Sequence, residues 1–174
     1  MNQFERLVDN YADDINSTSK VYFKNKPEII NRSFYKLWEI LTMLNLIDNT
    51  NNKFTSANIG DTPEGFIQAI IYFRELHSSN TKSDVHHSIK INNSEQPKDL
   101  YKTYKNVQVD NIKVIENIKE ITKISSPMAG KIDLVTADGV LTNVKQNVRE
   151  SKTFKILLGQ VILALKIQNI YDFL

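Results

Sequence analysis

A short turn with two glycines is the first segment whose residue types could do chemistry. It reads Gly60-Asp61-Thr62-Pro63-Glu64-Gly65-Phe66 and lies between a predicted strand and a predicted helix. Glycines at such a turn let the backbone pass close to a ligand, and the first N–H groups of the helix can bind polar atoms. A phosphate-binding P-loop is excluded, because Phe66 stands where its lysine should follow the glycine. An ordinary turn that uses Gly and Pro for its shape remains the alternative.

Two charged side chains elsewhere could act together on a bound substrate. Asp138 follows a predicted buried strand, so it would face the crevice where parallel sheets of this kind bind ligands. Lys36 lies off the apolar stripe of a predicted helix, so its ammonium can point away from the core. A turn or capping aspartate and a solvated surface lysine are the alternative interpretations.

Alternating strands and helices must position these residues. A helical stripe within residues 28–47 carries Lys36, and a strand at residues 54–59 leads into the glycine turn and an apolar helix. Further strands are predicted at residues 84–91, 107–109 and 131–139, and a further helix at residues 112–121. A last helix is marked by apolar residues at helical spacing, namely Phe154, Leu157, Leu158, Val161, Ile162 and Leu165. The pattern predicts an α/β fold with a mostly parallel, doubly wound sheet.

The composition is that of one globular domain. The chain has 174 residues, of which 41% are hydrophobic and 24% charged. With 22 Lys and Arg against 20 Asp and Glu, its net charge of +2 does not by itself indicate nucleic acid binding. The absence of cysteine excludes disulfides, thiolate metal sites and cysteine nucleophiles, and we expect no metal site. No signal peptide or membrane-spanning stretch is found in the sequence, so we expect a cytoplasmic protein without membrane contact.

Taken in order, these segments resemble FtsJ-like methyltransferases that use S-adenosylmethionine. The first matching pieces are Arg32-x-x-Tyr35-Lys36-Leu37-x-Glu39-Ile40 and Gly60-x-x-Pro63-x-Gly65-Phe66. They are followed by Asp133-Leu134-Val135-x-x-Asp138-Gly139 and Leu157-Leu158-x-Gln160-x-x-x-Ala164-Leu165. The resemblance covers residues 30–168, and residues 65–74 are especially similar to cap-type members from large DNA viruses.

The resemblance implies a Rossmann-like methyltransferase sheet with helices on both faces. It also implies methyl transfer from S-adenosylmethionine to a ribose 2′-hydroxyl of RNA, in many members at the mRNA cap. The family uses a Lys-Asp-Lys-Glu tetrad, whose first lysine and aspartate correspond to Lys36 and Asp138. The residues expected to bind the cofactor are Gly60, Asp61, Thr62, Pro63, Gly65, Phe66 and Asp110. RNA is the expected partner, and the basic residues near the expected entrance are Lys20, Lys24, Lys26, Arg32 and Lys36.

The sequence also departs from the family pattern. Glu64 stands where the family usually has another glycine, and its carboxylate could crowd or electrostatically disturb the cofactor pocket. The segment after residue 168 lacks the glycine pair, the second lysine and the glutamate of the tetrad, and Lys166 belongs to the helix before that place. We therefore expect residues 1–27 to be an N-terminal extension. Residues 28–174 would be a partial methyltransferase domain, truncated after the helix that follows the fourth strand.

Three functional interpretations stay open. The chain is a methyltransferase that is incomplete or inactive alone, a non-catalytic binding or regulatory subunit with the same fold, or the product of a split or decayed gene. The strand at residues 132–137 would lie at the edge of the sheet, where an unpaired backbone favours association. We therefore expect the isolated chain to be marginally stable, self-associated or completed by a partner polypeptide.

Overall fold

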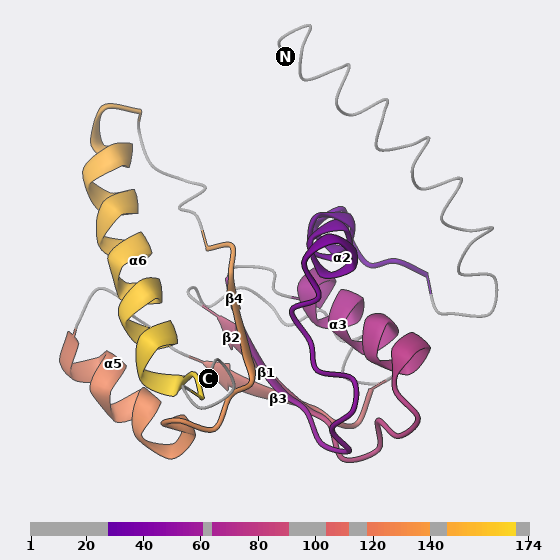
Figure 1. Cartoon of the computed structure of the whole chain (residues 1–174). Helices are drawn as coiled ribbons and strands as arrows, with labels where there is room; N and C mark the ends of the chain where they lie inside the picture. Colours follow the sequence, from indigo (N-terminus) through magenta and orange to yellow (C-terminus); the bar gives the residue numbers. More distant parts are fainter. Residues whose placement is uncertain (1–27, 61–63, 91–103, 112–117, 140–145, 170–174) are drawn as a thin grey trace, which may run out of the picture.

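Four parallel strands form the central sheet of the fold (Figure 1). The computed structural model describes residues 28–60, 64–90, 104–111, 118–139 and 146–169, so the predicted extension at residues 1–27 lies outside it. The strands lie in the order β3-β2-β1-β4 and each pairs in parallel with its neighbours. Their bounds are Thr55–Gly60 for β1, Val85–Lys90 for β2, Val107–Asn111 for β3 and Leu134–Ala137 for β4. All four predicted strands are confirmed, although β4 is shorter than predicted.

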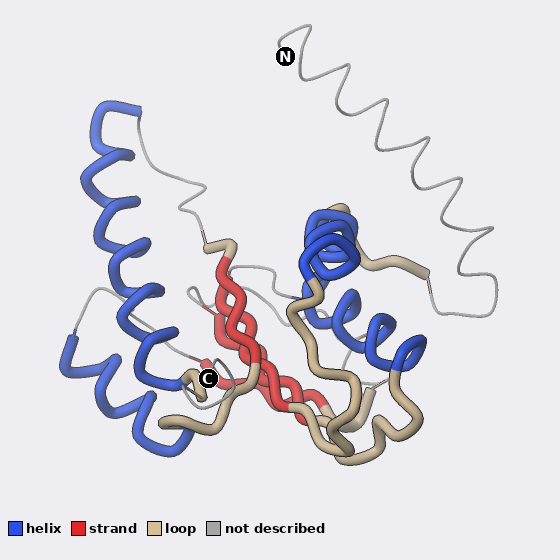
Figure 2. Tube along the Cα trace, in the orientation of Figure 1, coloured by secondary structure: helices blue, strands red, loops and turns tan. Residues whose placement is uncertain are grey.

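Helices cover both faces of the sheet, as Figure 2 shows. One face carries α2 (Ser33–Leu44) and α3 (Glu64–His77), and the other carries α5 (Ile118–Ser125) and α6 (Gln146–Ile167). A short 3₁₀ helix, η1 (Ser126–Met128), follows α5. Each face buries an apolar cluster of its own, the first around Phe34 and Ile67, the second around Ile59 and Leu163. The predicted α/β, Rossmann-like architecture with helices on both faces is confirmed.

Strand β1 is an interior strand of the sheet, with β2 on one side and β4 on the other. Every residue of β1 after Thr55 is buried, and Ala57 pairs with His87 of β2 and Val135 of β4. The chain proceeds outward from β1 through β2 to β3, then returns to the other side of β1 to form β4. This reversal makes the space beyond the carboxyl ends of β1 and β4 a topological switch point, where open α/β sheets bind their ligands.

Strand β4 is an edge strand in the described part of the chain. It pairs with β1 on one side, and on the other side an isolated parallel bridge joins Ile132 to Gln168. Leu134 is buried, whereas Ala137 at the end of the strand is exposed. The expected edge position of this strand is therefore confirmed for the described residues.

Most of the residues that marked the last helix in the sequence do not face the sheet. The helix itself is confirmed, but Ile156, Leu163 and Ile167 are its buried apolar residues in the described part of α6. Five of the marking residues are exposed, with exposed fractions of 62% for Phe154, 56% for Leu157, 46% for Leu158, 47% for Val161 and 73% for Leu165. Helix α6 is apolar on more than one side, so its periodicity could not decide which side packs.

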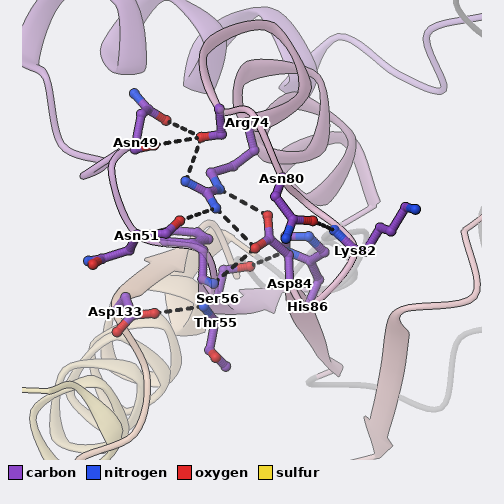
Figure 3. Close-up of polar contacts among 12 residues, drawn as sticks. Asn49, Asn51, Thr55, Ser56, Arg74, Asn80, Lys82, Asp84, His86 and Asp133 are labelled. Atoms are coloured by element: carbon purple, nitrogen blue, oxygen red, sulfur yellow. Dashed lines mark hydrogen bonds and ion pairs between the residues drawn. The ribbon is translucent and has the colours of Figure 1, made fainter.

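A buried polar cluster fixes the amino ends of β1 and β2 (Figure 3). Arg74 Nε donates to Asp84 Oδ2 at 2.9 Å, and both side chains are almost fully buried. Asp84 Oδ1 also accepts from the backbone N–H of Phe54, which precedes β1. Arg74 donates to the backbone carbonyls of Asp48 and Asn51 as well, at 3.3 and 3.0 Å. This cluster ties α3 to the loop before β1, at the opposite end of the sheet from the switch point.

Candidate active site

An ion pair joins Lys36 of α2 to Asp138, the residue that follows β4. Lys36 Nζ lies 3.3 Å from Asp138 Oδ2, although 102 positions separate the two residues in the sequence. The lysine side chain is 58% exposed and the aspartate side chain 40% exposed, so a molecule from solvent can reach both. The structure therefore brings together the two residues predicted to be catalytic, while their catalytic roles stay predictions.

Asp138 stands at the switch point because β4 pairs with β1. Its backbone N–H donates to the carbonyl of Ile59 at 2.9 Å, which extends the pairing of the two strands by one residue. Gly60, the last residue of β1, lies directly beside Asp138. A Cβ added at Gly60 would lie 3.6 Å from the carbonyl carbon of Asp138 and 3.7 Å from Gly139 N. Gly60 and Asp138 are therefore neighbours at the edge of the sheet where ligands of such folds bind.

Helix α2 carries Lys36 to this edge because its other side packs into the core. Phe34, Leu37 and Leu41 are buried at the spacing of successive helical turns, and Lys36 lies off that stripe. Phe34 also meets the ring of Tyr72 of α3 edge to face, with centroids 5.5 Å apart. The helix stops at Asn45, whose φ of 42° is the left-handed conformation that ends many helices.

Gln68 of α3 fixes the segment that leads into α2. Its Nε2 donates to the carbonyl of Glu28, and its Oε1 accepts from the N–H of Ile30, both at 2.9 Å. The Gln68 side chain is almost fully buried, so these bonds are shielded from water. They set where α2 begins and hence where Lys36 lies.

Gly65 and Phe66, both predicted to bind the cofactor, take part in the packing of α3. A Cβ added at Gly65 would overlap the side-chain amide of Asn31 and lie 3.0 Å from the backbone nitrogen of Phe34. The bare Cα therefore lets α3 approach the start of α2. Phe66 is partly buried and packs against the apolar cluster between these two helices and the sheet. Contacts of either residue with a cofactor stay predictions.

Asp110, also predicted to bind the cofactor, lies away from the Lys36–Asp138 pair. Asp110 lies near the carboxyl end of β3, where it pairs with Ile89 of β2. Because β3 is the far edge of the sheet, three strand spacings separate it from β4, roughly 14 Å in all. Asp61, Thr62 and Pro63 lie outside the described residues.

Lys166 is not placed to act with Asp138. It lies in the last turn of α6, before Ile167, whose carbonyl accepts from the N–H of Ile132 at 3.2 Å. That contact is at the amino end of β4, whereas Asp138 follows the carboxyl end. The length of the strand therefore separates Lys166 from the ion pair.

Glu64, the departure in the glycine turn, is the first residue of α3 and is fully buried. An acidic residue in the first turn interacts favourably with the helix dipole. Its side chain lies within the protein and not in the exposed space beside Lys36 and Asp138. The expectation that its carboxylate disturbs the cofactor pocket stays a prediction.

Two polar contacts at the switch point were not predicted from the sequence, although Gln160 belongs to one of the segments that carry the resemblance. Gln160 of α6 is 3% exposed, and its side-chain amide binds both the N–H and the carbonyl of Gly139, each at 3.0 Å. Thr136 Oγ1 of β4 donates to Asn58 Oδ1 of β1 at 2.7 Å. The available signal for Gln160 was a polar residue inside a strongly apolar helix.

Two other features are absent from the described residues. No helix in these ranges is long and apolar enough to cross a membrane. Within the same ranges, no three His, Asp or Glu residues are grouped so as to hold a metal ion.

Comparison with known proteins assigns the family. A search of curated protein sequences finds no significant match. The sequence model of the family described as FtsJ-like methyltransferase matches residues 29–169. The matched region runs from the segment before α2 to the end of α6, so it contains Lys36, Gly60 and Asp138, and it spans well over half of the chain. The chain therefore belongs to the FtsJ-like methyltransferase family.

Proposed function

We propose that this protein takes part in methyl transfer from S-adenosylmethionine to a ribose 2′-hydroxyl of RNA, with Lys36 and Asp138 in the active site. Membership of the family makes it a methyltransferase by descent. The observation that carries the finer proposal is the exposed Lys36–Asp138 pair at the switch point of the sheet. A lysine held by a carboxylate at that place suits the activation of a hydroxyl.

The residues at the switch point fit S-adenosylmethionine. Gly60 ends the central strand without a side chain, and helix α3 begins a few residues later, so its first N–H groups face the same edge. Together with Asp61, Thr62 and Pro63, Gly60 would hold the amino-acid end of the cofactor, and Asp110 would lie toward its adenosine. The bound cofactor would supply an electrophilic methyl group carried on a sulfonium sulfur.

Lys36 would act on the nucleophile. A ribose hydroxyl attacks poorly until negative charge develops on its oxygen, and an ammonium group at that oxygen stabilises this charge. Asp138 would hold the ammonium in place through the 3.3 Å contact, so that the hydroxyl is aligned with the methyl group. Because both side chains are partly exposed, a ribose can approach them from solvent.

RNA with a 5′ cap is the substrate that we propose. The support is the similarity of residues 65–74 to cap-type members of the family. Lys36 and Arg32 are both exposed, so the start of α2 presents positive charge next to the site, and positive charge attracts the phosphate backbone.

The experiment is a transfer assay with a labelled methyl group and a capped RNA oligonucleotide. The matched substrate control is the same capped RNA with a 2′-deoxy sugar at the first nucleotide. We expect saturable cofactor binding by calorimetry and transfer to the ribose form alone. Equal transfer to both RNAs would refute the 2′-hydroxyl of the first nucleotide as acceptor, and a folded chain without cofactor binding would refute the enzyme.

Variants of lysine test the site. Lys36→Met should lower the transfer rate by roughly a hundredfold, since it removes the charge at the nucleophile. Lys166→Met is the matched control, because this exposed lysine lies at the other end of β4. Equal rates for Lys36→Met and the native chain would exclude Lys36 from the chemistry.

We also propose that a polypeptide partner covers α6 and the open side of β4. The observation that favours it is the exposed apolar face of α6, made of Phe154, Leu157, Leu158, Val161 and Leu165. Contiguous apolar surface of this kind marks interaction sites, and an open strand edge accepts a further strand. This proposal also accommodates the alternative function, a non-catalytic methyltransferase-fold subunit that pairs with an active enzyme.

Light scattering after size-exclusion chromatography tests whether the exposed apolar face of α6 mediates association. Leu157→Lys with Leu165→Lys should abolish self-association or capture of a partner, because two charges would be buried in the interface. Leu76→Lys is the matched control, since Leu76 of α3 is 57% exposed and lies on another helix. A native chain that stays monomeric at high concentration and melts cooperatively would contradict the proposal.

A further inference from the structure

Gln160 binds the backbone on the carboxyl side of Asp138 with both ends of its side-chain amide. Its Oε1 accepts from the N–H of Gly139 and its Nε2 donates to the carbonyl of Gly139, each at 3.0 Å. The same Nε2 also lies 3.3 Å from the carbonyl of Ile156, one turn earlier in α6. One residue of α6 therefore takes up both backbone hydrogen-bonding groups of the residue next to Asp138.

The sheet alone does not fix this part of the chain. Strand β4 ends at Ala137, and within the described residues the bond from Asp138 N to the carbonyl of Ile59 is the last backbone contact with β1. On its other side, the described part of β4 has the bridge between Ile132 and Gln168, which lies at the amino end of the strand. Gln160 supplies at Gly139 the pair of bonds that a neighbouring strand would supply.

The surroundings of Gln160 explain why its hydrogen bonds must be made. The side chain is 3% exposed, and its neighbours on the buried side of α6 are Ile156 and Leu163. An amide buried among apolar groups is unfavourable unless its hydrogen bonds are made, and here the oxygen and the nitrogen both have partners. A leucine would fill the same space, so packing by itself does not require glutamine at this position.

We propose that Gln160 is a positioning residue that holds Asp138 in place for its contact with Lys36. The bond to Gly139 N–H fixes the peptide plane that follows Asp138, and the bond to the Gly139 carbonyl fixes the next plane. Together they limit the directions in which the carboxylate can point. Gln68 does the corresponding work on the other partner, since it holds the segment before α2 through Glu28 and Ile30. The contribution of Gln160 to methyl transfer rests on the function proposed above, whereas its effect on Asp138 does not.

Nuclear magnetic resonance of the full chain tests the effect on Asp138. The chain has five glycines, so the amide of Gly139 is readily assigned. In Gln160→Leu we expect hydrogen exchange at Gly139 to accelerate at least tenfold relative to amides of β1. We also expect the change that Asp138→Asn causes in the side-chain signals of Lys36 to shrink by at least half. Unchanged exchange at Gly139, or an unchanged effect of Asp138 on Lys36, would overturn the proposal.

Leu163→Ala separates positioning from general loss of packing. Leu163 is fully buried on the same side of α6, so its truncation weakens the helix contact but leaves the Gly139 bonds in place. It should leave the relative exchange of Gly139 and the signals of Lys36 as in the native chain. If it changes them as much as Gln160→Leu does, the positioning role is refuted.

Gln160→Glu is the second variant and covers the case in which Gln160→Leu does not fold. A carboxylate still accepts from Gly139 N but cannot donate to Gly139 O, so one of the two bonds is lost. Exchange at Gly139 should then accelerate less than in Gln160→Leu and more than in Leu163→Ala. A rate equal to that of the native chain would count against the proposal.

Transfer kinetics connect the positioning to catalysis. If the native chain methylates RNA, Gln160→Leu should lower kcat at least tenfold and leave KM for the cofactor within about threefold, because only the alignment of Lys36 is affected. An unchanged kcat, or an equal fall in Leu163→Ala, would overturn the positioning role in catalysis. If the native chain neither binds cofactor nor transfers methyl groups, the proposed function fails, and the exchange data still decide whether Gln160 positions Asp138.

Discussion

Arg74 and Asp84 form a fully buried ion pair in which two guanidinium nitrogens meet the carboxylate, Nε at 2.9 Å from Oδ2 and Nη2 at 3.1 Å from Oδ1. The pair joins α3 to the residue before β2, and Arg74 Nη1 also donates to Ser78 Oγ at 2.6 Å. Removing one partner of such a pair leaves the other charge buried and uncompensated. The cluster therefore supports the fold at the end of the sheet that carries no candidate site residue within the described ranges.

Arg74→Met should lower the free energy of unfolding by about 3–5 kcal/mol, because the Asp84 carboxylate loses its countercharge. Urea unfolding followed by circular dichroism measures the change. Arg74→Met combined with Asp84→Asn should cost less than the sum of the two single changes, since the double variant buries no charge. A loss below about 1 kcal/mol for Arg74→Met would show that the pair is not needed for stability.

Substitution by alanine should lower stability at Gly65 but hardly at Gly60. A Cβ at Gly65 would overlap Asn31, so Gly65→Ala should destabilise the fold by about 1–3 kcal/mol. A Cβ at Gly60 meets Asp138 and Gly139 at ordinary contact distances of 3.6 and 3.7 Å, so Gly60→Ala should change stability by less than about 1 kcal/mol. If Gly60 approaches the cofactor, its variant should instead weaken cofactor binding. Thermal unfolding and calorimetric titration measure the two effects.

Asn31→Ala is the control for the overlap at Gly65. The substitution removes the Asn31 side-chain amide, and with it the hydrogen bond that Ser33 N donates to Asn31 Oδ1 at 3.0 Å. Gly65→Ala should therefore lower the free energy of unfolding less in the Asn31→Ala background than in the native chain. We expect a difference of at least about 0.5 kcal/mol, as for other residues in contact. Additive losses would show that the cost at Gly65 arises elsewhere.

The order of strands and helices along the chain could be predicted from sequence because apolar patterns and turn residues mark these elements. A strand followed by a glycine turn and an apolar helix predicts the start of a βαβ unit in a parallel sheet, and such a sheet gathers the carboxyl ends of its strands at one edge. The matching of Lys36 and Asp138 came from resemblance to a family and not from spacing, since 102 positions separate them.

Other features could not be predicted because they depend on contacts between elements that are far apart in the sequence. Helix α6 has apolar residues on both its buried and its exposed sides, so periodicity did not distinguish Leu163 from Leu165. The packing of Gly65 against Asn31 and Phe34 is a contact between elements that no local pattern records, and its predicted contact with a cofactor stays a prediction. The bonds of Gln160 depend in the same way on where Gly139 lies in space.

His86 should make stability depend on pH. It is buried in β2 with Nδ1 2.9 Å from Ser56 Oγ, and burial lowers its pKa to about 4. In the unfolded chain its pKa is near 6.5, so between pH 6.5 and about 4 the unfolded state binds more protons than the folded state. The contribution of neutral His86 is therefore complete above pH 6.5, falls as the pH drops through this window and is constant below about pH 4.

Urea unfolding at pH 7 and at pH 5 measures this dependence, and His86→Gln is the matched variant. The native chain should lose on the order of 2 kcal/mol more than the variant between these two pH values, given a full shift of 1.36 kcal/mol per pKa unit. The comparison removes the contributions of carboxylates and of His77 and His87, which both proteins share. Equal losses in the two proteins would show that His86 is protonated in the folded state or is open to water.

Asp138→Asn should separate stability from activity. The side chains of Lys36 and Asp138 are 58% and 40% exposed, and exposed ion pairs contribute about 0–1 kcal/mol to stability. The backbone bond from residue 138 to Ile59 does not involve the carboxylate, so the end of β4 should keep its place. Unfolding should therefore shift by less than about 1 kcal/mol, while methyl transfer should fall roughly a hundredfold because Lys36 loses the group that holds it. A variant that unfolds as easily as Arg74→Met, or that transfers methyl groups at the native rate, would show that Asp138 serves the fold and not the reaction.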